Sequence, residues 1–254
     1  MTRGETERGE RVGAVIVAAG RSTRAGQDKI WADLGGQAVL AHTIQAIAAS
    51  NDVDEIVVVV HSDRLAEGET LLASLGLPGT VRGGGSRRRD SVRSGLEGLH
   101  GCQWVIVHDG ARPFPRTDLP RIGLEAARPT GAAVAAVRSR DTVKRVQDNL
   151  VHSTPPREEM FLVQTPQVFR LELLQAALES SDDDVTDEAT LLERMGITVR
   201  VFAGNAENFK ITTAEDLEFA RAWHSLRSSN TVGRQASPEQ PRLGTESQAS
   251  TPLQ

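Results

Sequence analysis

The segment Ala18–Lys29 has the composition of a loop that holds phosphate groups. Its small residues, Ala18–Gly20, follow the apolar run Val12–Val17, and Arg24 and Lys29 come shortly after them. Small residues let the backbone approach a ligand and offer its N–H groups to phosphate oxygens, while the cations neutralise phosphate charge. The pattern predicts a strand that opens into a loop for a nucleoside triphosphate. An ordinary glycine turn with solvated arginines is the alternative.

Two widespread phosphate-binding motifs do not fit this segment. The dinucleotide fingerprint G-x-G-x-x-G needs a second glycine where Ser22 stands. The P-loop G-x-x-x-x-G-K-[ST] needs a lysine directly after its second glycine, but Gly26 is followed by Gln27 and Asp28. The segment therefore belongs to neither class.

Polar residues also follow other apolar runs, at positions where open α/β sheets bind ligands. Three glycines before Ser86 lead towards Ser91 and a helical pattern, which favours a nucleotide-binding turn; a flexible loop with Ser91 as the helix N-cap is the alternative. Asp109 suits a sugar hydroxyl or a magnesium-bound water, and Arg112 suits a phosphate. A structural Asp–Arg ion pair stays open, and His108 fits a structural histidine better than a base.

Three later segments carry weaker signals. The stretch Gln164–Gln167 closes an extended segment and has the composition of a turn. Thr186 precedes two acidic residues, which predicts a helix N-cap with a favourable helix dipole. Lys210 lies in an apolar segment, and a lysine that points inward needs an anion beside it. A lysine whose amine reaches the surface is the equal alternative.

Composition excludes several functional classes. The 254 residues carry a formal net charge of −5, which argues against general nucleic-acid binding. The single cysteine, Cys102, cannot form an internal disulfide and suits a reducing compartment. The segment Met1–Arg11 is charged and lacks the apolar stretch of a signal peptide, and no apolar run reaches membrane-spanning length. We expect a cytoplasmic protein without nucleic-acid or membrane partners.

Short β-branched runs alternate with helical patterns, which predicts an α/β fold. The expected strands are Val12–Val17, Glu55–Val60, Trp104–His108, Ala132–Val137 and Thr198–Phe202. The expected helices are Val39–Ala49, Arg64–Leu75, Ser91–Leu99, Leu119–Ala127, Leu171–Leu178 and a last helix that begins at Thr212 or Thr213, with Thr212 and Glu215 as a capping box, and ends near Leu226.

Two segments interrupt this alternation. Within Arg140–Pro156, two extended runs flank the turn-like Gln147–Asn149, which predicts a hairpin that projects from the sheet. After Ser225 the chain is rich in Ser, Pro, Gln and Thr, which predicts a disordered tail. We expect a flexible N-terminus over 1–11, one domain over 12–226 with an arm at about 140–156, and a disordered tail over 227–254.

Taken in order, six motifs resemble those of the 2-C-methyl-D-erythritol 4-phosphate cytidylyltransferase family of non-mevalonate isoprenoid biosynthesis. The resemblance runs from about Val12 to Trp223. The motifs are Ala18-Ala19-Gly20 with Arg24 and Lys29, Arg88–Val92, His108–Pro113, Thr165–Gln167, Thr186–Ala189 and Asn208–Thr212. The resemblance implies a nucleotidyltransferase domain with a Rossmann-like, mostly parallel sheet flanked by helices, and a projecting β-arm that forms a homodimer.

The resemblance also implies the reaction and the residues for it. CTP and 2-C-methyl-D-erythritol 4-phosphate would give the cytidine diphospho-sugar alcohol and pyrophosphate, with Mg²⁺ held mainly by CTP phosphates and water and with no protein residue assigned to it. The implied catalytic residues are Arg24, Lys29 and Lys210. The implied CTP-binding residues are Ala18, Ala19, Gly20, Gly84, Arg88 and Ser91. The implied substrate-binding residues are Asp109, Arg112, Thr142, Arg157, Thr165 and Thr186.

The first loop departs from the family pattern at three positions. Ser22 stands for the second glycine, Ala25 for a methionine, and Asp28 for the proline before the catalytic lysine. These departures concern the geometry of the loop and its affinity for CTP.

Two other functions share the same fold. A ribitol-5-phosphate cytidylyltransferase shares most of the phosphate-binding residues, but the motif that contains Asp109 is closer to the methylerythritol enzymes. A non-catalytic nucleotide-sensing module is the second alternative. The presence of Arg24, Lys29 and Lys210 together argues against it, because sensing needs binding but no bridging cation.

Overall fold

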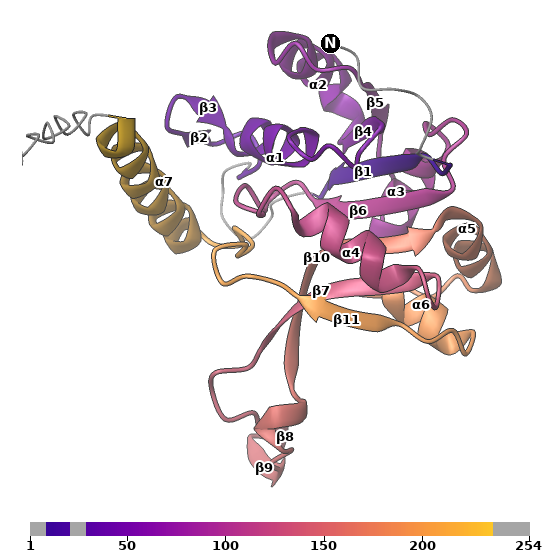
Figure 1. Cartoon of the computed structure of the whole chain (residues 1–254). Helices are drawn as coiled ribbons and strands as arrows, with labels where there is room; N and C mark the ends of the chain where they lie inside the picture. Colours follow the sequence, from indigo (N-terminus) through magenta and orange to yellow (C-terminus); the bar gives the residue numbers. More distant parts are fainter. Residues whose placement is uncertain (1–8, 21–28, 236–254) are drawn as a thin grey trace, which may run out of the picture.

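Seven strands form one sheet through the middle of the protein, in the order β11-β7-β10-β6-β1-β4-β5 (Figure 1). The structure is a computed structural model and describes residues 9–20 and 29–235. Neighbouring strands are parallel, except that β10 is antiparallel to both β6 and β7. The strands are β1 (Val12–Ala18), β4 (Glu55–Val60), β5 (Thr80–Gly83), β6 (Trp104–Asp109), β7 (Ala132–Arg138), β10 (Phe161–Arg170) and β11 (Arg200–Ala203).

Both faces of this sheet are covered by helices, which explains why the central strands are continuous apolar runs. In β4, Val58 and Val60 pack into one core layer, while Val57 and Val59 pack into the other. The first layer contains side chains of α1 (Val39–Ala48), α2 (Leu65–Ser74) and α4 (Leu119–Ala127). The second contains side chains of α3 (Arg88–Leu96), α5 (Leu171–Ser180) and α6 (Ala189–Arg194). The expected α/β fold with a mostly parallel sheet is confirmed.

Two strands of the sheet are absent from the sequence-based expectation. Strand β5 has only four residues and ends in glycine, so it carries little apolar signal. Strand β10 contains Pro166, and a proline argues against a central strand because it lacks an N–H. The structure accommodates Pro166 because it lies between Val163 and Gln167, where the pairing of β10 with β7 shifts register. The prediction of a turn over Gln164–Gln167 is therefore wrong.

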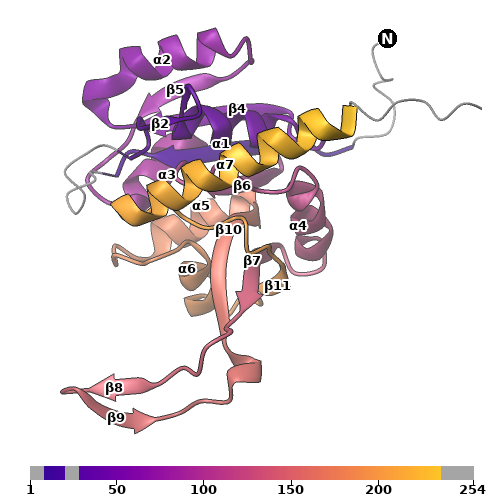
Figure 2. The same cartoon turned by 90° about the vertical axis from the view of Figure 1, so that its left-hand side faces the viewer.

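The predicted hairpin projects well away from the sheet, as both views show (Figures 1 and 2). It consists of β8 (Arg145–Gln147) and β9 (Leu150–Ser153), joined by Asp148 and Asn149, which both have positive φ angles. Positive φ at both central positions is the geometry of a tight hairpin turn, and Asp and Asn tolerate it well. A short 3-10 helix, Arg157–Glu159, leads from this arm back into β10.

The C-terminal helix α7 (Ala214–Gln235) packs beside the small antiparallel pair β2 (Asp33–Leu34) and β3 (Gln37–Ala38). Its capping contacts join Thr213 to Asp216, with each backbone N–H donating to the other side chain, rather than Thr212 to Glu215. The helix also runs beyond the expected end at Leu226, so residues up to 235 of the expected disordered tail are helical. Residues 236–254 lie outside the described part. In the described ranges, no helix is long and apolar enough to cross a membrane.

Candidate active site

A cavity of about 910 Å³ opens at the carboxyl ends of β1, β4, β5 and β6. Parallel strands all end at the same edge of a sheet, so the residues that follow them meet there although they are far apart in sequence. The lining residues are Val17, Ala18, Ala19, Gly20, Lys29, Ile30, His61, Ser62, Asp63, Gly84, Gly85, Ser86, Arg87, Arg88, Ser91, Asp109, Ala111, Lys210, Ile211 and Thr212.

One wall of the cavity, which we call the glycine wall, is made of Ala18–Gly20 and Gly84–Ser86. The Gly84 N–H donates to the Val60 carbonyl at 2.8 Å, which holds this turn against the end of β4. A Cβ atom on Gly84 would lie 2.2 Å from the Cβ of Ala19, so no other residue fits without displacing the backbone. The two turns therefore pack closely and present backbone rather than side chains to a ligand.

Helix α3 begins at the rim of this wall. Its N-cap is Arg87, whose N–H donates to Asp90 Oδ2 at 3.2 Å. Ser91 thus lies in the first turn and is not the N-cap, because the helix starts three residues earlier than the expected Ser91. The Ser91 hydroxyl donates to the Arg87 carbonyl at 3.2 Å. Arg87, Arg88 and Ser91 of this N-terminal turn line the cavity, and a helix N-terminus is a suitable place for anionic or polar ligand groups.

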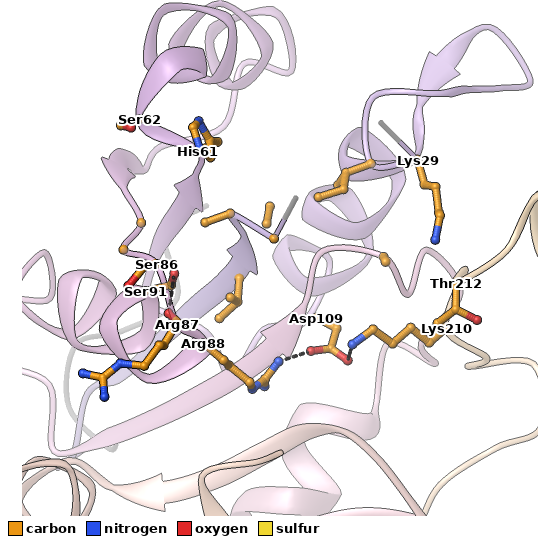
Figure 3. A pocket seen from close by; sticks show the side chains of 18 of the residues that line it. Lys29, His61, Ser62, Ser86, Arg87, Arg88, Ser91, Asp109, Lys210 and Thr212 are labelled. Atoms are coloured by element: carbon orange, nitrogen blue, oxygen red, sulfur yellow. Dashed lines mark hydrogen bonds and ion pairs between the residues drawn. The ribbon is translucent and has the colours of Figure 1, made fainter. Parts of the chain in front are cut away.

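The opposite wall, which we call the charged wall, is centred on Asp109 at the end of β6 (Figure 3). Its Oδ1 accepts from Arg88 Nη1 at 2.5 Å. Its Oδ2 lies 3.2 Å from Arg112 Nε and 3.1 Å from Lys210 Nζ. The other edge of the Arg88 guanidinium donates to Glu188, with Nε at 2.9 Å from Oε1 and Nη2 at 3.0 Å from Oε2. Five charged groups therefore form one continuous network.

Burial and charge shift the pKa values of this network in opposite directions. Burial alone would raise the pKa of Asp109, but Arg88, Lys210 and Arg112 hold it well below its ordinary value. Burial raises the pKa of Glu188 despite its pairing with Arg88. Burial also lowers the pKa of Arg112, against the opposing effect of Asp109. Asp109 is therefore ionised and acts as an acceptor for cations and hydroxyl groups.

A buried chain of hydrogen bonds supports Asp109 from behind. The Asp109 N–H donates to Thr165 Oγ1 at 2.9 Å, and the Thr165 hydroxyl donates to His108 Nδ1 at 3.1 Å. The Nε2 of His108 donates to the Arg112 carbonyl at 3.2 Å. Burial lowers the pKa of His108 to about 4, so this histidine is neutral and has both ring nitrogens engaged. The expectation of a structural histidine agrees with this geometry.

The segment that carries Lys210 is fixed to the same support. Asn208 is fully buried, and its Nδ2 donates to the Thr165 carbonyl at 2.7 Å. Its own carbonyl accepts from Arg112 Nη1 at 2.7 Å. Ile211 N–H donates to the Ala111 carbonyl at 2.9 Å. Lys210 therefore lies between two fixed residues, and its amine meets the Asp109 carboxylate although its side chain is 42% exposed.

Lys29 approaches the cavity from a different segment. It is half-buried and points towards the side of the cavity where Lys210 and Thr212 lie, whereas His61 and Ser62 lie on the far side (Figure 3). Arg24, the remaining residue expected to be catalytic, lies outside the described residues. So do the three departures from the family loop, Ser22, Ala25 and Asp28.

Several residues expected to bind the substrate do not line the cavity of this single chain. Arg112 and Thr165 are buried behind Asp109, and Arg112 forms the Asp–Arg ion pair that was the structural alternative. Thr142 lies in the arm and Arg157 directly after it, and both residues are exposed. Thr186 is exposed and is not the cap of α6; the residue at the N-cap is Glu188, and Asp187 Oδ1 accepts from the Thr190 N–H at 3.2 Å.

Sequence reasoning missed two parts of the site. His61, Ser62 and Asp63 line the cavity because they follow β4, and their position after a buried strand was a usable signal. Glu188 was interpreted only as an acid at a helix N-terminus. Its pairing with Arg88 joins residues 100 positions apart, and no local pattern indicates such a contact.

Comparisons with known proteins place the chain in one family. The sequence profile of the 2-C-methyl-D-erythritol 4-phosphate cytidylyltransferases matches residues 12–225. The enzyme of this description from Dehalococcoides mccartyi strain CBDB1 is 46% identical over 215 residues, which are 83% of this chain and 95% of that protein. A bifunctional enzyme of Anaeromyxobacter sp. Fw109-5 is 42% identical over 222 residues, 85% of this chain and 58% of that longer protein.

Solved structures give the same result. The 4-diphosphocytidyl-2C-methyl-D-erythritol synthase of Anaerococcus prevotii superposes with a TM-score of 0.76 at 32% identity, covering 85% of this chain and 99% of that one. The 2-C-methyl-D-erythritol 4-phosphate cytidylyltransferase of Thermus thermophilus superposes with a TM-score of 0.70 at 32% identity, covering 85% and 99%.

Proposed function

Because the chain belongs to the 2-C-methyl-D-erythritol 4-phosphate cytidylyltransferase family, we propose that its glycine wall binds CTP and its charged wall binds the methylerythritol phosphate. The reaction joins CTP and 2-C-methyl-D-erythritol 4-phosphate to 4-diphosphocytidyl-2-C-methyl-D-erythritol and pyrophosphate, in the non-mevalonate isoprenoid pathway. The observation that carries the proposal is one cavity of about 910 Å³ with these two unlike walls and two lysines, Lys29 and Lys210, on its lining. A volume of this size lies at the upper end for small-molecule sites, which suits two substrates.

The reaction does not require a general base. A phosphate oxygen of the acceptor attacks the α-phosphorus of CTP, a new P–O bond forms, and the bond to the β-phosphate breaks to release pyrophosphate. The attacking phosphate is already anionic, so catalysis rests on alignment and on neutralising the charge of the transition state. The neutral, fully bonded His108 is therefore not needed as a base.

We assign the neutralisation to Arg24, Lys29 and Lys210. Lys210 is held by Asp109 and lies on the lining of the cavity, so it can reach both reacting phosphate groups. Lys29 approaches from a separate segment and adds a second preorganised cation. Preorganised charges of this kind cost no rearrangement during the reaction, and this is where most of the rate acceleration arises.

The nucleotide would lie along the glycine wall. Ala18, Ala19, Gly20 and Gly84, together with Ser91 in the first turn of α3, line the space for the cytidine and its phosphates. Arg88 was expected to bind CTP, but its guanidinium bridges Asp109 and Glu188, so we place it with the acceptor instead.

The acceptor would lie against Asp109. An ionised carboxylate can also accept hydrogen bonds from the hydroxyl groups of a sugar alcohol, and a ligand that lacks these groups cannot make them. Arg112 and Thr165 act by holding Asp109 in place. Thr142, Arg157 and Thr186 can contact this substrate only if the arm of a second copy, or a closing movement, brings them to the cavity.

The phosphates of the nucleotide are better ligands for Mg²⁺ than the side chains of this site. In the described part of the chain, no group of three or more His, Cys, Asp or Glu side chains is placed to hold a metal. Both oxygens of Asp109 already face cations. Mg²⁺ commonly keeps several water ligands and binds through substrate phosphates. We therefore expect Mg²⁺ to arrive with CTP and to neutralise its phosphates.

The arm supports a homodimer. Its side chains Val146, Leu150 and Val151 are 54%, 73% and 61% exposed, and Leu162 at its base is 58% exposed. A two-stranded hairpin without a core of its own is marginally stable, and an exposed apolar group on it suits a second copy of the chain. Arg157 would then serve the active site of the neighbouring subunit.

A single assay tests the proposed substrate. The purified protein is incubated with CTP, Mg²⁺ and either 2-C-methyl-D-erythritol 4-phosphate or ribitol 5-phosphate, and pyrophosphate release is measured. The proposal predicts turnover with the first acceptor and a kcat/KM for the second that is lower by orders of magnitude. Equal turnover of both acceptors would contradict it. We also propose that the enzyme works in the reducing cytoplasm, where the buried Cys102 stays a free thiol.

A further inference from the structure

Glu188 is a buried carboxylate whose role is not explained by the reaction. The Glu188 side chain is 1% exposed. Among the described residues, its closest side-chain partner is Arg88, from which it accepts two nearly parallel hydrogen bonds. Taking both charges out of water costs several kcal/mol per ion, and such pairs are often no more stabilising than apolar side chains of the same size. Stability alone is therefore a weak reason for a Glu–Arg pair at this position.

The geometry of Arg88 connects Glu188 to the cavity. A guanidinium is planar and rigid, so fixing its Nε–Nη2 edge also fixes the direction of Nη1. Glu188 holds that edge, and Nη1 donates to Asp109 Oδ1. The orientation of the Asp109 carboxylate is thus determined from one side by Glu188 through Arg88, and from the other by Arg112 and Lys210.

The two neighbouring arginines show that this arrangement is specific to Arg88. Arg87 donates to Asp90 and to the Asp182 carbonyl at the rim of the cavity. Arg89 is buried and donates to the carbonyls of Leu178 and Asp183, which ties α3 to the end of α5 and to the segment after it. Only Arg88 of these three joins two buried carboxylates and also lines the cavity.

We infer that Glu188 is a positioning residue for the acceptor substrate: acting through Arg88, it sets the orientation of the Asp109 carboxylate that receives the hydroxyl groups of the sugar-alcohol phosphate. This inference rests on the proposed placement of the acceptor against Asp109. Without the charge of Glu188, Arg88 is free to turn and to bind Asp109 with both of its terminal nitrogens, in competition with the acceptor. Glu188 does not face the glycine wall, so CTP binding does not depend on it.

The first test is the variant Glu188→Gln, with KM measured separately for each substrate. The KM for 2-C-methyl-D-erythritol 4-phosphate should rise by about tenfold, the scale of one charge-assisted hydrogen bond, while the KM for CTP stays within about twofold. The matched control is Glu97→Gln, which breaks another Glu–Arg pair at the end of the same helix, with Glu97 Oε2 2.6 Å from Arg82 Nη2 on the surface. This control should keep both KM values.

A second variant keeps the inference testable if Glu188→Gln does not fold. In Arg88→Met/Glu188→Met both charges are replaced by apolar side chains, a change that is often neutral or stabilising for buried pairs. This protein should fold with an unchanged KM for CTP and a raised KM for the acceptor. A purely structural role for the pair would leave both KM values unchanged in the folded variant, and that result would overturn the inference. A rise in the KM for CTP instead would also overturn it.

The variant Asp109→Asn, measured in the same assay, separates the two proposals. If it raises the KM for the acceptor and Glu188→Gln does not, the role of Glu188 fails and the proposed site stands. If Asp109→Asn raises only the KM for CTP, the placement of the acceptor fails, and the inference about Glu188 fails with it.

Discussion

The glycine wall and the charged wall of the cavity are built in opposite ways. The glycine wall consists of two short segments, Ala18–Gly20 and Gly84–Ser86, each a run of neighbouring small residues that brings backbone groups close to a ligand. The charged wall consists of side chains from four distant segments, which contain Arg88, Asp109, Glu188 and Lys210. The first depends on close packing of the backbone and the second on a network of buried ion pairs.

Because of this difference, the two walls should tolerate different kinds of amino-acid substitution. Added side-chain volume should disturb the glycine wall, because its closely packed backbone cannot move to make room. A charge network is disturbed by removing one member, because the remaining charges are left buried and unpaired. Substitutions that keep size but remove charge should therefore act on the charged wall, and substitutions that add a methyl group should act on the glycine wall.

The largest effect is expected at Lys29, which lines the cavity on the side of Lys210. Lys29→Ala should lower kcat by about a hundredfold or more, because it removes one preorganised charge from the transition state. Steady-state kinetics with both substrates measures this. The surface residue Arg121, which donates to Glu125 on α4, provides the control, and Arg121→Ala should retain kcat. An intact kcat with only the KM for CTP raised would show that Lys29 binds CTP in the ground state.

Subunit exchange tests whether the charged wall is completed by a second copy. Inactive Lys29→Ala and inactive Arg157→Ala are mixed in equal amounts under conditions that exchange subunits. If Arg157 acts in the neighbouring subunit, each mixed dimer has one site with both lesions and one with none, so about a quarter of the wild-type activity should return. No recovery above the residual rates of the parents would show that each chain completes its own site.

A smaller effect is expected from the support behind Asp109. Burial lowers the pKa of His108 from 6.5 to about 4, so the unfolded chain binds the proton first as the pH falls. The contribution to stability is complete above about pH 6.5 and is lost as the pH falls towards 4. Lowering the pH from 7 to 5 should therefore reduce the free energy of unfolding by about 2 kcal/mol through His108.

Urea unfolding at the two pH values measures this loss, and His108→Gln is the comparison. The variant cannot take up a proton at this position, so its unfolding free energy should change less over the same range. An equal change in both proteins would mean that His108 does not carry the pH dependence.

The smallest effect is expected at the C-terminus. The described residues that line the cavity end at Thr212, and α7 packs its core contacts through Leu217 and Ala220. A protein that ends at Ser228 should therefore keep wild-type kcat, both KM values and its Tm. A Tm lower by several degrees would show that the removed residues pack against the domain.

The sequence allowed prediction of the features that depend on local patterns. Most of the parallel strands, most helices and the projecting hairpin follow from periodicity and turn chemistry, and the ends of α4 agree with the prediction at both residues. The glycine turns could also be recognised, because a turn of this kind needs particular residues in a row. Strand β5 and the helical continuation of α7 could not, since a short edge strand and a polar helix carry little apolar signal.

The charged wall shows where this prediction stops. The motifs that contain Arg88, Asp109 and Lys210 were identified, and a pair between Asp109 and Arg112 was one alternative, but the contacts of Asp109 with Arg88 and Lys210 were not predicted. Arg88 was assigned to CTP and Arg112 to a phosphate, whereas both guanidinium groups bind Asp109. The partner Glu188 is 100 residues from Arg88, so only the folded topology brings the two together. Pair contacts across a sheet edge are a property of the fold and not of a local pattern.

The central claim is that the two walls bind different substrates, and two variants test it directly. Gly84→Ala adds a methyl group 2.2 Å from the Cβ of Ala19, and Asp109→Asn removes one charge without changing size. Measured in one assay, Gly84→Ala should raise mainly the KM for CTP, and Asp109→Asn should raise mainly the KM for 2-C-methyl-D-erythritol 4-phosphate. If both variants raised the KM of the same substrate, the division of the cavity between its two walls would be contradicted.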